Sequence, residues 1–279
     1  MNKIITNNNG LPDVANDIFK NKKNIIDFVK SWKFWFKAII TMLIIFFVLY
    51  DIIDHCINIP KHDVYQQFIY ENKNGEQLVD YFRIVFWDLS YFTIQSNLLM
   101  AAWLIYAAIY NFNEHEKKLT STNASLFVII YLTTTALIYN GILFPISIGN
   151  GEYKEWTTFY WIRNEFLHTV GPILSVIYVL LFLKVKEVKQ TKLFFKEDSW
   201  KSLYYPIGYG VFSFAKQGVM ALEGFTYENT AQYPFLDMKN SWWLFIVAAL
   251  AIATIGVTLS TLYNFIISKR IGRTEHGTN

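Results

Sequence analysis

Six long apolar runs, separated by polar loops, constrain this chain more than any other feature. Each is near the ~20 residues that a helix needs to cross the hydrocarbon layer of a bilayer. The remaining segments of a chain with 53% hydrophobic residues are too short to bury a separate soluble core. We therefore predict an all-α integral membrane bundle of six transmembrane helices. The six runs are 36–53, 84–110, 125–146, 166–182, 202–220 and 242–267.

Three parts follow from this pattern: a polar, basic segment (1–32), the transmembrane domain (33–268) and a tail (269–279). Lys and Arg concentrate in the amino-terminal segment, in the loop after the fourth run and in the tail. Because basic loops stay cytoplasmic, both termini are predicted there. This asymmetry accounts for the net charge of +3 without a nucleic acid partner. The long polar leader argues against a cleavable signal peptide.

The composition also limits the chemistry and the location. Cys56 is the single cysteine, which excludes an intrachain disulfide, and the five histidines are dispersed, so we expect neither a metal nor a cofactor. No GxSxG, HExxH, P-loop or GxGxxG motif is present. Richness in Lys, Asn, Ile and Phe fits an AT-rich bacterial genome. We expect a multi-pass protein of a bacterial plasma membrane whose partners are lipids, and leave its oligomeric state open.

Polar side chains inside the runs are predicted to lie at one depth. With a rise of about 1.5 Å per residue, four runs place polar groups in the outer half of the bilayer. Polar groups in lipid need a partner or a function. The residues of this predicted layer are Asp88, Thr93, Asn97, Asn140, Glu165, His168 and Lys216. In the fourth run, Gly171 and Pro172 thin or bend the helix beside His168, which lets a neighbour or a ligand approach.

Each of these residues also has a purely structural interpretation. Thr93 could bond the carbonyl four residues earlier, and His168 could join two helices. The asparagines could likewise connect helices, the ammonium of Lys216 could extend to the interface, and the two acids could be interfacial. It is the shared depth of these groups that favours a functional layer.

Three short motifs occur in an order that resembles a known family. They are YFTIQSNLL at 91–99, FLHTVGPIL at 166–174 and YPFLD at 233–237. Together they resemble the androgen-induced and androgen-dependent membrane hydrolases and their bacterial relatives, over roughly residues 82–264. The resemblance implies hydrolysis of fatty acid esters of hydroxy fatty acids, with Thr93 as nucleophile and His168 as its partner. The long leader and the Gln95–Asn97 extension depart from the animal proteins.

The implied chemistry gives the other polar residues possible roles. A threonine hydroxyl needs a base, and neutral His168 is suited to this task. Asn97, Asn140 and Lys216 are candidate oxyanion donors, and Glu165 or Asp88 could orient the imidazole. Two alternatives remain: a small-solute transporter that uses the same layer, and a non-enzymatic membrane binding or scaffold protein.

Overall fold

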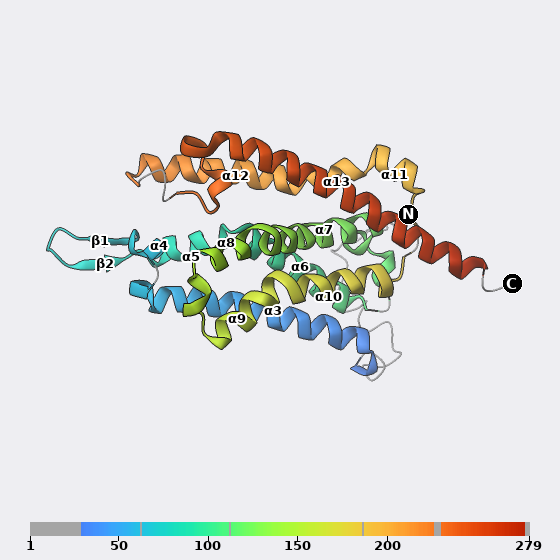
Figure 1. Cartoon of the computed structure of the whole chain (residues 1–279). Coiled ribbons are helices and arrows are strands. Elements are labelled where there is room, and N and C mark those ends of the chain that lie inside the picture. The colour runs from blue at the N-terminus through green and yellow to red at the C-terminus, as the bar shows by residue number, and fades with distance from the viewer. Residues whose placement is uncertain (1–28, 62, 112, 186, 226–229, 277–279) are drawn as a thin grey trace, which may run out of the picture.

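The computed structural model is a bundle of helices with one small hairpin (Figure 1). It describes residues 29–61, 63–111, 113–185, 187–225 and 230–276. Most of the predicted basic segment and the last three residues of the tail lie outside these ranges. The main elements are α3 (Trp32–Ile57), α4 (Asp63–Gln66), β1 (Ile69–Glu71), β2 (Gln77–Val79), α5 (Tyr81–Leu89), α6 (Phe92–Ile109), α7 (Thr122–Ile138), α8 (Phe144–Gly149), α9 (Thr158–Glu165), α10 (Gly171–Ile177), α11 (Thr191–Glu197), α12 (Tyr204–Leu222) and α13 (Met238–His276).

Five helical segments of the described chain are long and apolar enough to cross a membrane. They are Trp32–Ile57, Phe92–Ile109, Thr122–Gly149, Thr158–Phe182 and Trp242–Gly272. The predicted fifth run, 202–220, is also helical, as α12, but it is not one of the five. Its tyrosines and glycines, with Lys216 and Gln217, dilute its apolar character. The all-α prediction is confirmed at this level.

The connection between α3 and α5 is more ordered than a loop. After α3 ends, a 3₁₀ turn and α4 lead into the antiparallel pair β1–β2, in which Glu71 faces Gln77. A turn at Asn72–Gly75 closes this hairpin. Gly75 has φ of 80°, a conformation that favours glycine, and the Asn72 side chain accepts the N–H groups of Asn74 and Glu76.

The outer surface of the bundle is apolar along α3. Ile39, Met42, Phe46 and Ile53 repeat at helical spacing and are 46–62% exposed, whereas Ile44 on the opposite face is 1% exposed. A continuous apolar stripe of this length is rarely left in water. Contact with lipid tails gives it a suitable environment.

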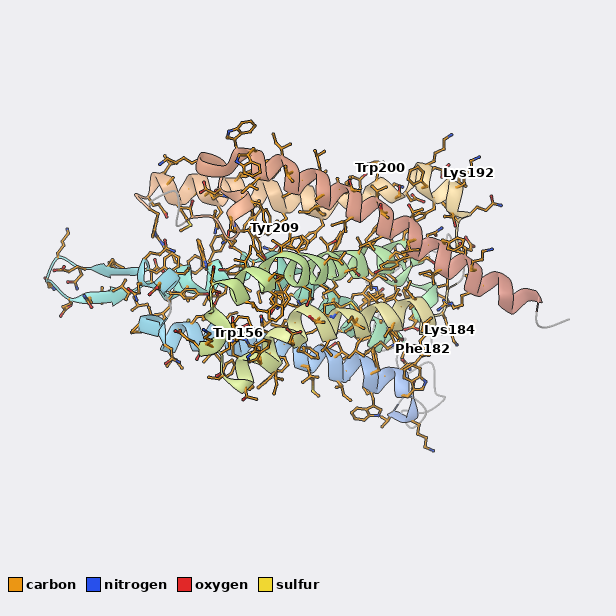
Figure 2. The ribbon with its side chains drawn as sticks, viewed as in Figure 1. Trp156, Phe182, Lys184, Lys192, Trp200 and Tyr209 are labelled. Atoms are coloured by element: carbon orange, nitrogen blue, oxygen red, sulfur yellow. The ribbon has the colours of Figure 1, made fainter. Side chains whose placement is uncertain are left out.

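The start of α3 and the end of α13 lie at the same end of the bundle, opposite the hairpin (Figure 1). Lys33 donates a hydrogen bond to the Phe182 carbonyl, and Arg270 donates to the carbonyls of Leu180 and Leu183. Both helix ends therefore bind one stretch of backbone. Lys184 and Lys192 also lie at this end (Figure 2).

An ion-pair cluster holds the segment before α12. The buried Asp198 carboxylate contacts Lys189, with Nζ 2.6 Å from Oδ2, and Lys201. Burial alone would raise the pKa of Asp198, but the hydrogen bonds from Lys189 and Lys201 outweigh it and hold that pKa below its usual range.

We expect Asp198→Asn to lower stability at neutral pH by about 1 kcal/mol, because both lysines are partly exposed and screened by solvent. A carboxylate whose pKa is lowered by folding stabilises the folded state fully at pH values above its unfolded-state pKa of about 3.9. This stabilisation is lost as pH falls through its folded-state pKa. Thermal unfolding of both proteins in detergent should therefore differ at pH 7 and converge once the pH falls through the lowered pKa of Asp198. Glu187→Gln, at an exposed acid outside this cluster, is the control. A difference that persists in acid would contradict this explanation.

Candidate active site

Thr93 lies at the start of a helix rather than inside one. The second predicted run is split before Phe92, where α6 begins, because Tyr91 is extended with ψ of 134°. The freed carbonyl of Ser90 accepts a hydrogen bond from the Tyr209 hydroxyl at 3.0 Å. A single continuous helix over 84–110 was therefore a wrong prediction. The split leaves the first N–H groups of α6, including that of Thr93, without helical acceptors.

The hydroxyl of Thr93 is not bonded to the carbonyl four residues earlier. That carbonyl, of Leu89, accepts a hydrogen bond from Gln95 Nε2 at 3.0 Å instead. The phenol of Tyr233, from the YPFLD motif, interacts with the Thr93 hydroxyl and with the backbone amides of Phe92 and Thr93. The first turn of α6 therefore faces polar groups of another segment.

His168 lies in a widened helical turn. Phe166–Val170 is π-helical and leads into α10. Pro172 has no N–H to continue an ordinary ladder, which favours such a bulge. Gly171 is required at this point, since a Cβ there would lie 2.8 Å from the Phe166 carbonyl oxygen. The predicted bend beside His168 thus takes the form of a π-helical turn.

The orientation of the His168 ring follows from two contacts. Its Nδ1 lies 2.8 Å from the carbonyl oxygen of Asn164, which can only accept. Nδ1 therefore carries the proton, and in the neutral ring Nε2 keeps its lone pair. The ring stacks on Tyr139, with centroids 4.1 Å apart, in a second π-helical turn, Tyr139–Leu143. Two widened turns thus meet at this histidine.

Thr93 and His168 line one polar cavity of about 330 Å³. It lies among α3, α5, the start of α6 and the two π-helical turns, and its lining includes Trp156, which is labelled in Figure 2. Its lining includes the acids Asp51 and Asp88, the basic side chains of His55, Arg163 and His168, and the hydroxyl of Thr93. No hydrogen bond joins the Thr93 hydroxyl to His168 among the described side chains. Such contacts often form only when substrate is bound.

An apolar groove of about 320 Å³ adjoins this cavity. It lies among α7, α12 and α13, and its lining includes Tyr209, which is labelled in Figure 2. Thr93, Tyr139, Leu143 and Tyr233 line both the groove and the polar cavity. Thr93 therefore stands at the boundary between a polar space and an apolar one.

The two asparagines of the predicted layer do not line the polar cavity. Asn97 Nδ2 donates to the backbone carbonyls of Thr93 and Leu167, so both of its amide hydrogens are used between helices. Asn140 is exposed and bonds Thr169. Neither asparagine is placed as an oxyanion donor.

Glu165 and Lys216 do not line the polar cavity either. The ammonium of Lys216 is buried and lies 3.8 Å from the ring centre of Trp87, a cation–π contact. It does not extend to an interface. Asp88 does line the cavity, but its carboxylate bonds His55 and Tyr65 and not His168. Neither acid therefore orients the His168 ring.

Sequence reasoning missed two polar side-chain pairs in the cavity. Arg163, 7% exposed, forms an ion pair with Asp51 across α9 and α3. His55 Nδ1 lies 3.0 Å from Asp88 Oδ2. His55 and Asp51 are four residues apart on one face of α3, a spacing that could have drawn attention to them. The described residues contain no cluster of three or more His, Cys, Asp or Glu side chains placed to hold a metal ion.

Comparisons with known proteins do not assign a family. No protein-family model matches the chain, and no solved structure matches it. An uncharacterized protein of Mycoplasma genitalium, MG452, is 32% identical over 123 residues, which make up 43% of this chain and 44% of that protein. The match therefore covers less than half of that relative.

Proposed function

We propose that this protein is a lipid-ester hydrolase in which Thr93 is the nucleophile. The observation that carries the proposal is the position of Thr93 where a polar cavity meets an apolar groove. An ester of a long-chain acid has the same division, because its carbonyl lies between a hydrocarbon chain and a more polar group. The motif resemblance to the androgen-induced and androgen-dependent hydrolases points to the same residue.

In the proposed reaction, the acyl chain occupies the groove and the ester carbonyl lies beside Thr93. Nε2 of His168 accepts the hydroxyl proton as the oxygen attacks, and the C–O bond to the leaving alcohol breaks as His168 returns that proton to it. Substrate binding would displace the Tyr233 phenol from the backbone N–H groups of Phe92 and Thr93, which can then stabilise the oxyanion. An acyl group remains on Thr93.

The proposed setting is a bacterial plasma membrane, crossed six times, with α12 as the additional span. The shared end of α3 and α13, with its nearby lysines, would face the cytoplasm. The cavity would then lie toward the outer leaflet, where a lipid could enter the groove sideways. In this placement, membrane lipids remain the proposed partners of the protein.

A transporter reading finds less support in the packing. In the half of α6 toward the basic end, Met100, Leu104 and Ala107 are each 0% exposed and belong to the apolar core. A polar path would need to pass through this layer.

Purified protein in nanodiscs should release acid from a long-chain p-nitrophenyl ester. Solute uptake into proteoliposomes without ester cleavage would favour transport. The absence of both activities would favour a scaffold protein.

The groove should determine which acyl-chain length the protein prefers in its ester substrate. Gly210 lines it, and a Cβ there meets no atom within 4 Å. Leucine at this position should project into the groove and displace about two methylenes of substrate, at about 0.8 kcal/mol each. Gly210→Leu should therefore lower kcat/KM for a long-chain ester roughly tenfold relative to a butyrate ester.

Gly208→Leu is the matched control, because Gly208 also has open space around its Cβ but lies outside the groove lining. It should leave the preference unchanged. Equal loss with both variants, or with both substrates, would contradict the acyl-chain assignment.

A further inference from the structure

The mechanism above leaves the histidine–aspartate pair of the cavity unused. His55, near the end of α3, pairs with Asp88 of α5, and both line the space that holds Thr93. The Tyr65 hydroxyl donates to the other oxygen of Asp88 and lies 2.9 Å from His55 Nδ1. Three separate elements of the fold thus converge on one imidazole.

This arrangement favours a base at His55. A carboxylate can only accept, so Asp88 fixes the proton on Nδ1 and makes Nε2 the nitrogen that can take a second proton. Asp88 also stabilises the imidazolium that results, as in carboxylate–histidine pairs of other enzymes. His168, by contrast, has only a backbone carbonyl as its partner.

Tyr65 donates a hydrogen bond to Asp88 and so helps to hold the carboxylate in place beside His55. Burial and the nearby Asp88 carboxylate raise the pKa of the Tyr65 hydroxyl far above its ordinary value, so it remains a donor. The Asp88 side chain is 4% exposed, whereas that of His55 is 18% exposed. The imidazole is therefore the member of the pair that meets water.

We propose that His55, oriented by Asp88, activates the water that hydrolyses acyl-Thr93. This inference rests on the proposed function. Nε2 of His55 takes one proton from water as the water oxygen bonds to the acyl carbon. The bond between that carbon and the Thr93 oxygen then breaks, and the same proton passes to Thr93, which releases a carboxylic acid. His55 is the catalytic residue of this step, and Asp88 is its positioning residue.

The test separates the two half-reactions. With a p-nitrophenyl ester, His55→Ala should still release one equivalent of p-nitrophenol in a burst. Its steady-state rate should fall about 100-fold or more, because general bases contribute 10²–10⁴. Acylated Thr93 should accumulate and be visible by mass spectrometry. Added imidazole should restore turnover, which a purely structural role for His55 would not allow.

Asp88→Asn should show the same burst and a slower steady state, and His55→Ala/Asp88→Asn should lose little more than His55→Ala. Loss of the burst in His55→Ala, an unchanged steady-state rate, or absence of imidazole rescue would each overturn the proposal. Failure of the proposed function itself is distinguishable, since the wild-type protein would then cleave no ester, or Thr93→Ala would still cleave it.

Discussion

Thr93→Ala is expected to lower hydrolysis of a long-chain ester by at least about 1,000-fold, the scale of losing a nucleophile. Thr93→Ser should keep measurable turnover, because it retains a hydroxyl at the start of α6. Initial rates in nanodiscs test both variants, with thermal unfolding to show that each is folded.

Thr254→Ala provides the matched control. This exposed threonine of α13 bonds the Leu250 carbonyl at 2.8 Å and lies outside both the cavity and the groove. Its loss should leave turnover unchanged. Wild-type activity in Thr93→Ala would end the assignment of Thr93 as nucleophile.

The second large effect concerns stability. Lys37 Nζ lies 2.8 Å from both Glu114 Oε2 and the Ala107 carbonyl, and the Tyr178 hydroxyl also bonds Glu114. Lys37 and Glu114 are each 0% exposed. Glu114→Ala should destabilise the protein by about 3–5 kcal/mol, because it leaves an uncompensated buried ammonium. Chemical denaturation in mixed micelles measures the loss.

A double replacement distinguishes charge burial from lost packing. Lys37→Met/Glu114→Leu should recover most of the stability, since apolar residues of similar volume remove both desolvation costs. Glu187→Ala, an exposed acid at the same end, should have little effect. A double variant no more stable than Glu114→Ala would contradict this explanation.

The helices could be predicted because the length of an apolar run is a local property of the sequence. The hairpin turn at Asn72–Gly75 was likewise local. The split before Phe92 was not, because it depends on Tyr209, a residue far away in the chain, which satisfies the carbonyl of Ser90. A run of apolar residues does not reveal such a remote partner.

At the site, depth along a helix could be estimated, but partners across helices could not. The predicted level placed Thr93 and His168 near each other, and both line one cavity. Asn97 shares that level, yet its amide bonds two backbone carbonyls. His55 was overlooked because it lies near the end of a helix, beside a polar loop, and only the fold brings Asp88 to it.

The central claim is that Thr93 attacks an acyl carbonyl at the boundary of the cavity and the groove. A long-chain fluorophosphonate, which bonds covalently to activated hydroxyls, tests it most directly when peptide mass spectrometry locates the adduct. We predict one adduct, on Thr93, that forms much more slowly in His168→Gln. An adduct on another hydroxyl, with Thr93 unmodified while ester hydrolysis is abolished, would contradict the account.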